Sequence, residues 1–513
     1  MMNRFVAFCV GLLLAIPWAG WAERINQEGR ILGPLPAVTD AILFNTTNAD
    51  AVLSALQIFP VTSAWNEDIS RRPVLTNSAA MLAQISADLL SSRRNLRLFQ
   101  EMNFVLVPDP QPLLPIEFVD YPDESDLNGG VSPHGRYPVP ANMPIEGWPT
   151  ETSGQTLAQA QEDALGLGGD RHSIIVQPGS GALWETWQAL RSGTHWQASN
   201  GALFNLNTNG LRPAGWTSAD AAGLPMFPAL VRFDECERGL VEHACRIVVK
   251  RTRYGSYVYP ANHYAAPSTN TNVNLPAMGQ RLRLKAGFVI PTTWTKQERA
   301  LLLGLKKYGA LVADNGNFFS ISITPDDRWP AGAFDHISSL GITNFEVIQA
   351  TGPAAGPRSP GAPTVSAGPD QSLPIYQTVQ LPGIVSYTGT PPVVQWKLYS
   401  GPGTVTFGDA TQPSTTASFS TPGIYTLLLS ADDGVHAVAY DAAVLSVTNA
   451  VRVAIARAGT HASLTWEGGQ PPFVVQQAEA LPATFWNSAA TTTQRSVTLP
   501  MTNSAAVFRV QAQ

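Results

Sequence analysis

A stretch rich in glycine, proline and alanine at residues 353–363 divides the 513-residue chain into parts of different character. Such a stretch forms neither a regular helix nor a paired strand and is typical of a semi-rigid linker. Residues 23–352 carry most of the histidine and tryptophan, whereas the residues beyond the linker form short alternating segments rich in Val and Thr. The sequence therefore predicts a multidomain protein. We expect a β-rich α+β core over residues 23–352 and two all-β sandwich-type modules over residues 364–449 and 450–513.

The periodicity of the core predicts few helices and many strands. Residues 77–91 carry an amphipathic pattern typical of a helix. Residues 295–308 are expected to form a second helix, which Thr295 caps and Gly309 ends. Three short runs are expected to be strands: residues 173–176, 281–285 and 318–323.

The N-terminus has the pattern of a secretory signal peptide. Residues 1–4 form a short positive region through Arg4, residues 5–16 form a short apolar run, and Ala22 ends a cleavage site of small residues. We expect cleavage after Ala22 and a secreted protein, extracellular, periplasmic or at the cell surface, with no membrane span afterwards. The alternative is a retained membrane anchor. The net charge of −6 excludes a strongly basic nucleic-acid binder.

Signal cleavage removes one of the three cysteines and leaves Cys236 and Cys245, with eight residues between them. In a secreted protein such a pair most often forms a local disulfide, which is our expectation here. A metal site that includes His243 is the alternative, but it needs more ligands than the neighbouring sequence offers.

Five motifs beyond the linker share the spacing of one known domain type: residues 367–371, 393–397, 400–403, 419–425 and 431–434. With these motifs, residues 364–449 resemble a PKD-like or immunoglobulin-like domain of bacterial surface proteins. The resemblance implies that Trp396 lies in the core and that Tyr425 is a corner tyrosine. It implies a spacer or binding module without catalytic residues.

The last module shows apolar and polar alternation at residues 462–466, 473–476 and 506–510. It resembles the C-terminal fibronectin-like modules of secreted bacterial proteins, and that resemblance implies a role in attachment or sorting.

Six motifs of the core also occur in one known group of proteins: residues 65–69, 169–172, 212–225, 231–235, 243–244 and 313–316. They resemble a family of large exported bacterial proteins of unestablished activity, across residues 55–350. The resemblance therefore implies no mechanism, and the candidate site has to come from side-chain chemistry.

Two groups of acidic and histidine side chains are candidates for acid–base catalysis. Asp234 and Glu235 follow an apolar run, with a histidine eight residues further on. Asp170 and His172 precede a strand and share one face of it, and a hairpin would bring Glu185 towards that face. The alternatives are a solvated loop for the first group and a hydrogen-bonded structural histidine for the second.

Aromatic and polar residues around His263 resemble the lining of a sugar-binding cleft. Rings stack on the apolar face of a pyranose, while amide and charged groups bind its hydroxyls. His263 joins the catalytic candidates, and the substrate-binding candidates are Arg232, Trp216, Tyr264 and Asn262.

The sequence thus predicts a secreted carbohydrate-active protein, a polysaccharide hydrolase or lyase with accessory β-sandwich modules. The alternative is a non-catalytic glycan- or matrix-binding surface protein. In a lyase, His263 or Tyr264 would abstract a proton while Arg232 or Arg246 neutralised a uronate. We expect a monomer whose partner is a polysaccharide or surface glycan, and no metal ligands are assigned.

Overall fold

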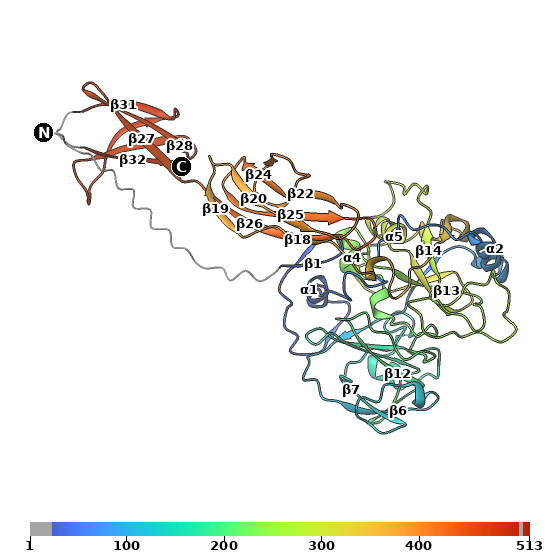
Figure 1. The fold of residues 1–513 in the computed structure, drawn as a ribbon. Helices are drawn as coiled ribbons and strands as arrows, with labels where there is room; N and C mark the ends of the chain where they lie inside the picture. The colour runs from blue at the N-terminus through green and yellow to red at the C-terminus, as the bar shows by residue number, and fades with distance from the viewer. Residues whose placement is uncertain (1–22, 153, 502–505, 513) are drawn as a thin grey trace.

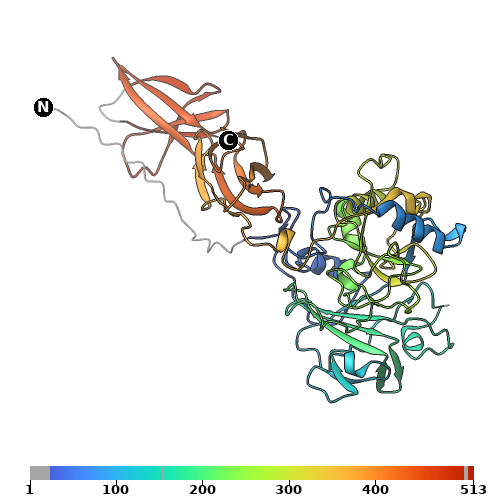
Figure 2. The same ribbon diagram turned by 45° about the vertical axis from the view of Figure 1, so that its right-hand side comes forward.

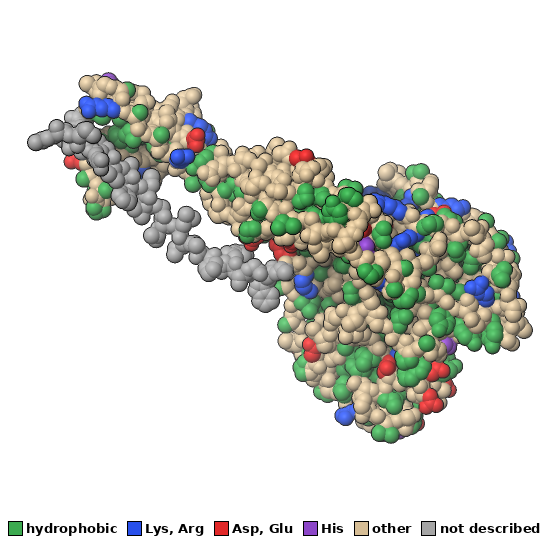
Figure 3. Space-filling view, in the orientation of Figure 1, with side chains coloured by type: hydrophobic (Ala, Val, Ile, Leu, Met, Phe, Trp, Pro, Cys, Tyr) green, Lys and Arg blue, Asp and Glu red, His purple; other side chains and the backbone are tan. Residues whose placement is uncertain are grey.

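A computed structural model describes residues 23–152, 154–501 and 506–512. The expected signal peptide, residues 1–22, lies outside the described residues. The described chain is elongated, with a large rounded core at one end, a β-sandwich in the middle and a smaller β-module at the far end (Figures 1 and 2). On the face drawn in Figure 3, charged side chains gather mainly on the core and are sparse on the sandwich.

The core contains a mixed six-stranded sheet in which β13 runs parallel to β15 and antiparallel to β16. Its strands in spatial order are β17 (Phe345–Val347), β14 (Arg281–Leu284), β15 (Ala310–Asn315), β13 (Cys245–Val249), β16 (Ser320–Ile323) and β4 (Arg97–Gln100). The strands expected at residues 281–285 and 318–323 are therefore confirmed within one or two residues.

A five-stranded sheet lies beside it. Its order is β12 (Asn200–Asn205), β9 (Ala182–Trp187), β8 (Ser173–Gln177), β5 (Val105–Leu106) and β3 (Ile42–Leu43). Alternate residues of β8 enter different clusters: Ile174 and Val176 join the main core, whereas Ile175 joins a second one. Both faces of this sheet are therefore buried, which explains the continuous apolar run of β8.

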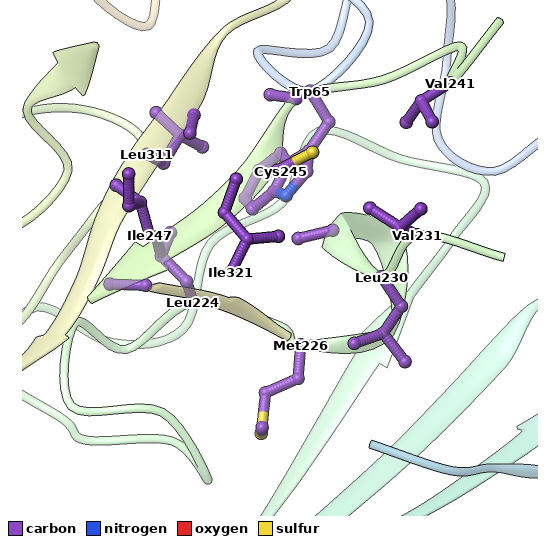
Figure 4. Close-up of a cluster of buried hydrophobic side chains, with 14 of the residues drawn as sticks. Trp65, Leu224, Met226, Leu230, Val231, Val241, Cys245, Ile247, Leu311 and Ile321 are labelled. Carbon is purple, nitrogen blue, oxygen red and sulfur yellow. The ribbon is translucent and has the colours of Figure 1, made fainter. Parts of the chain in front are cut away.

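The second cluster packs a four-stranded sheet against the outer face of the five-stranded sheet. Its strands are β10 (Leu190–Ser192), β11 (His195–Ala198), β6 (Leu114–Phe118) and β7 (His134–Tyr137). The main cluster joins the five- and six-stranded sheets, and Figure 4 shows part of it, with Ile247, Leu311 and Ile321 among the side chains drawn. A short pair, β1 (Arg24–Ile25) and β2 (Ile31–Leu32), completes the core strands.

The α-helices described in the core are α1 (Thr47–Ala55), α2 (Ser78–Asp88), α3 (Leu157–Gln161), α4 (Phe233–Arg238) and α5 (Lys296–Lys307). Helix α5 begins with a capping box between Thr295 and Glu298 and ends before Gly309, which has φ +67°, so this prediction is confirmed. Helix α2 ends three residues earlier than expected, and a 3₁₀ turn (Ser91–Arg93) follows it. Further 3₁₀ turns are Pro122–Glu124, Phe227–Ala229, Ile337–Ser339, Ile342–Asn344 and Gly356–Arg358.

The middle module is a β-sandwich, because a four-stranded and a three-stranded sheet share one apolar cluster. The first sheet is β19 (Gln371–Pro374), β26 (Ala439–Thr448), β25 (Gly423–Asp432) and β22 (Val393–Ser400); the second is β20 (Val379–Pro382), β24 (Ser414–Phe419) and β23 (Val405–Phe407). A short pair, β18 (Thr364–Ser366) and β21 (Ile384–Ser386), flanks them. Trp396 is buried in the cluster, and the Tyr425 hydroxyl donates to the Thr421 carbonyl at 2.8 Å. Both expectations for these residues are confirmed.

The last module also has two sheets around one cluster, which contains Trp466 and Phe473. The first sheet consists of β27 (Val451–Ala458), β28 (His461–Gly468) and β31 (Ser496–Pro500). The second consists of β30 (Asn487–Thr492), β29 (Phe473–Ala478) and β32 (Val507–Ala512).

The stretch 353–363 is anchored on both sides. The Arg358 guanidinium donates to the Thr62 carbonyl at 2.9 Å, pairs with Glu67 at 3.1 Å and lies over the Tyr259 ring. The next residue, Ser359, contacts His436 of the sandwich through its carbonyl at 3.0 Å. The connection therefore contacts both the core and the sandwich.

The expected disulfide between Cys236 and Cys245 is wrong. Both are free, buried cysteines, one on α4 and the other at the start of β13. The Cys236 thiol donates to the Gln297 carbonyl at 4.0 Å, and both side chains belong to the main apolar cluster. They act as small core residues, a common role for buried cysteine.

Candidate functional site

A buried arginine organises the main polar site of the core. Arg246 projects from β13 and makes a bidentate pair with Asp220, at 3.0 and 2.9 Å. It also donates to the Ser322 hydroxyl at 2.9 Å and lies 3.7 Å from Asp314, at the end of β15. Buried charges of this kind persist only where they are paired and hydrogen-bonded. We call the ionisable groups that interact around it the Arg246 cluster: Glu101, Glu146, His172, Glu185, Asp220, Arg246 and Asp314.

His172 is held by Glu146 and a backbone carbonyl. Its Nδ1 lies 2.8 Å from Glu146 Oε2, and its Nε2 lies 2.9 Å from the Ala219 carbonyl, next to Asp220. Burial acts to lower the pKa of His172, but the charge of Glu146 outweighs it and raises the pKa to about 9. Burial acts to raise the pKa of Glu146, but the charge and hydrogen bonds of His172 lower it below its usual value. The pair is therefore ionised near neutral pH.

Three carboxyl groups of the cluster titrate close to neutrality. The pKa of Glu101 is raised to about 7 by burial and by the charge of Glu146. The pKa of Glu185 is also raised to about 7, because burial outweighs the N–H bonds it accepts from Phe227 and Met226. Burial and the charge of Asp220 raise the pKa of Asp314 to about 7. Perturbed groups of this kind gather at functional sites.

These acids differ in access to solvent. The Glu185 side chain is completely buried, because the β8–β9 register places it opposite Ile174 on the main core face. The Asp314 carboxyl is half-buried, with 29% of its side chain exposed, and Glu146 is 14% exposed. Only the partly exposed groups can reach a substrate, so Asp314, Glu146 and the half-buried Glu101 are the reactive candidates of the cluster.

Aromatic residues form the rim beside Asp314. His263 Nδ1 lies 2.7 Å from the Ala221 carbonyl, one residue from Asp220, and its ring stacks on Tyr264. Tyr264 in turn meets the exposed ring of Tyr254 edge to face. Two hydrogen bonds tie this rim to β15: the backbone N–H of Ala222 donates to the Ala313 carbonyl, and the side-chain amide of Asn315 donates to the Ala265 carbonyl.

Asp234 and Glu235 lie outside the Arg246 cluster. Both are buried on α4, where Glu235 pairs with Arg232 at 2.6 Å and with His243 at 3.0 Å, and Asp234 pairs with Arg238 at 2.6 Å. Burial acts to raise the pKa of Glu235, but Arg232 and His243 lower it to about 2. These pairs form a second charged group around α4, apart from the hydrogen bonds that hold His172. The segment that carries Asp234 and Glu235 is not a solvated loop, because both side chains are buried.

The remaining candidates take three different positions. Asp170 is exposed and accepts from the Trp187 indole N–H at 3.3 Å; its place at His172 is taken by Glu146. Asn262 is buried and donates to the carbonyls of residues 212 and 213. Trp216 is half-buried beneath the Arg212 guanidinium. His172, Glu185 and the His263–Tyr264 rim thus belong to one region, and Asp170, which lines a cavity together with Glu146, lies at its edge.

Sequence reasoning missed Glu101, Glu146, Asp220 and Asp314. One local signal pointed towards them, because Arg246 interrupts an otherwise apolar strand and therefore needs a buried carboxylate partner. Among the described residues, no group of three or more His, Cys, Asp or Glu side chains has the arrangement of a metal site. No helix in the described part of the chain is long and apolar enough to cross a membrane.

No protein-family model and no curated protein matches the chain. Solved structures that resemble part of it include domains A168–A170 from titin, at 15% identity and a TM-score of 0.14, over 29% of this chain and 60% of that one. The chain thus spans less than two thirds of the titin fragment. Another is DIP-gamma Ig1+Ig2, at 12% identity and a TM-score of 0.14, over 29% of this chain and 94% of that one. Both contain immunoglobulin-like domains.

Proposed function

We propose that the protein is a secreted polysaccharide hydrolase whose site lies where Asp314 meets the His263–Tyr264 rim. One observation carries the proposal: a half-buried carboxyl with a pKa raised to about 7 lies on β15, to which hydrogen bonds of its neighbours tie the segment with the Tyr264 and Tyr254 rings. Aromatic rings bind the apolar faces of sugars. A carboxyl protonated near neutral pH supplies the general acid that a glycosidic leaving group needs.

Hydrolysis also needs an ionised carboxylate to act as base or nucleophile. Glu146 keeps its charge, since His172 lowers its pKa, and part of its side chain reaches solvent. The Arg246 cluster thus contains both forms, a protonated and an ionised carboxyl, that acid–base cleavage requires.

A lyase is less well supported. Elimination from a uronate requires a cation that is free to neutralise the substrate carboxylate. Arg246 already forms a bidentate pair with Asp220, and Arg232 pairs with Glu235. Both charges are buried and compensated, so neither is available to a uronate.

The N-terminal signal and the two β-modules complete the proposal. Residues 1–22 direct export with cleavage after Ala22, and the modules act as spacers or glycan-binding units around a monomeric enzyme. Sequencing the N-terminus of exported protein tests the first part, because the mature chain should begin at Glu23.

The experiment is a screen of the mature chain against a polysaccharide panel with product analysis. New reducing ends indicate hydrolysis, whereas unsaturated uronates indicate elimination. Binding without any product would support the alternative, a non-catalytic glycan-binding protein. Tyr264→Ala should weaken glycan binding, and Tyr121→Ala, which removes an exposed tyrosine elsewhere on the core, should not. Equal binding by the two variants would contradict the placement of the site.

A further inference from the structure

The side chain of Asn315, the last residue of β15, connects the tyrosine rings of the rim to the strand that carries Asp314. We propose that Asn315 is a positioning residue, which holds the Tyr254–Tyr264 ring pair in register with the Asp314 carboxyl. This inference rests on the proposed function and goes beyond it, because it assigns a role to a residue outside the acid–base pair.

The Asn315 amide binds both segments that carry the ring pair. Its NH₂ group donates to the carbonyl of Ala265, which follows Tyr264. Its oxygen accepts from the hydroxyl of Thr252 at 3.1 Å, two residues before Tyr254. Thr252 is completely buried, so water does not compete for its hydroxyl. One amide therefore uses a donor and an acceptor to fix two separate segments to the end of β15.

A second amide passes this restraint on to Tyr254. The Asn270 side chain donates to the Thr252 carbonyl at 3.0 Å, and the backbone N–H of Tyr254 donates to the Asn270 carbonyl at 2.9 Å. The rings of Tyr254 and Tyr264 meet edge to face, with their centroids 5.3 Å apart. A shift of either segment would therefore change the surface on which a sugar would stack.

The backbone of Asn315 contacts the acid itself. Burial and the charge of Asp220 raise the pKa of Asp314 to about 7, and the Asn315 N–H, which donates to Asp314 Oδ1 at 2.7 Å, acts in the opposite direction. Asn315 thus contacts the acid through its backbone and the ring segments through its side chain. A misplacement of about 1 Å can lower turnover about 10²-fold, so this register should control the rate.

The fold should survive the loss of the Asn315 side chain. The rim keeps another bond to β15, since the backbone N–H of Ala222 donates to the Ala313 carbonyl. The Thr252 hydroxyl also lies 3.4 Å from the Ala265 carbonyl, so it keeps an acceptor. Asn315→Ala should therefore fold, with a melting temperature about 2–4 °C below that of the wild type.

The test compares Asn315→Ala with Asn48→Ala, a control at an exposed asparagine of α1, in the mature chain. On a polysaccharide that the wild type cleaves, Asn315→Ala should lower kcat about tenfold or more. Its affinity for the glycan, measured by calorimetry, should change less than about threefold, because both rings remain. The control should change neither quantity.

Two more substitutions separate positioning from folding. Thr252→Val is nearly isosteric and removes the hydroxyl that Asn315 accepts, so it should lower kcat about threefold with little change in affinity. Asn315→Asp places a negative charge beside Asp314, which raises the pKa of that acid further. The high-pH limb of kcat should therefore move to higher pH in Asn315→Asp and stay in place in Asn315→Ala.

A measurement without substrate uses ¹⁹F NMR of protein labelled with 3-fluorotyrosine. Tyr254→Phe and Tyr264→Phe assign the two resonances, which Asn315→Ala should shift and Asn48→Ala should not. Unchanged resonances would overturn the inference. Full kcat in Asn315→Ala, or a loss of affinity at unchanged kcat, would overturn it too and leave the hydrolase standing. If the wild type cleaves no polysaccharide, the hydrolase fails, and the fluorotyrosine shifts still decide whether Asn315 holds the ring pair.

Discussion

Replacing Glu185 by glutamine should flatten the pH dependence of stability. Glu185 is completely buried, and burial raises its pKa from 4.5 to about 7. The folded state therefore holds this proton more tightly than the unfolded state does. The resulting stabilisation is fully present below about pH 4.5 and is lost as the pH rises through about 7.

The size of the effect follows from the shift. A pKa difference of 2.5, from 4.5 to about 7, corresponds to at most about 3.4 kcal/mol. Between pH 5 and pH 8 the wild type should lose about 2–3 kcal/mol of unfolding free energy through this group. A glutamine amide does not titrate, so Glu185→Gln should lack this loss.

The variant should still fold. Oε1 of Glu185 accepts the N–H groups of both Met226 and Phe227 at 2.9 Å, and the amide oxygen of glutamine can accept both. The other carboxylate oxygen, 3.0 Å from Met226 N, becomes an NH₂ group that faces a donor. That mismatch should cost about 1–2 kcal/mol, independent of pH.

Urea unfolding at pH 5, 6, 7 and 8 measures the effect, with Glu117→Gln as the control at an exposed carboxylate. Glu101, Asp314 and His172 contribute to the pH dependence of both proteins, so the difference between wild type and variant isolates Glu185. Parallel stability curves for the wild type and Glu185→Gln would show that burial of Glu185 does not set this pH dependence.

Three further predictions follow from individual contacts. Burial raises the pKa of both thiols, so Cys236 and Cys245 should react with a thiol reagent only after denaturation; a disulfide-linked peptide in non-reducing mass mapping would contradict this. Arg358→Ala should accelerate limited proteolysis within residues 353–363, because the guanidinium anchors this stretch to the core; an unchanged rate would count against that anchor. Tyr425→Phe should lower the unfolding free energy of the sandwich by about 1–2 kcal/mol, as measured in urea, because a carbonyl loses its donor; no change would argue against the corner contact.

Local patterns predicted local structure well. The capping pair of α5, the apolar run of β8 and the buried Trp396 all depend on neighbours in the sequence or on burial of a large ring. The Cys236–Cys245 prediction failed because it rested on cellular compartment and spacing. It ignored that both side chains pack in an apolar core between a helix and a strand.

The candidate site was only partly predictable, since its contacts are distant in sequence. His172 meets Glu146 from 26 residues away, and Arg246 meets Asp220 at the same separation. The expected hairpin brought Glu185 towards the face of His172, but neither the hairpin nor the strand spacing could identify the carboxylate that binds the imidazole. Asp234 and Glu235 have the composition of a catalytic pair, yet nearby arginines on the same helix and at its start neutralise them.

The proposed hydrolase depends above all on Asp314 as the acid that cleaves a bound glycan. The variant Asp314→Asn tests this role when it is assayed for binding and turnover on a polysaccharide from the panel, beside the exposed control Asp327→Asn. We expect Asp314→Asn to retain glycan binding and its melting temperature within a few degrees, while turnover falls about 10²–10⁴-fold and the control stays active. Full turnover by Asp314→Asn, or no binding and no cleavage of any glycan by the wild type, would contradict this role.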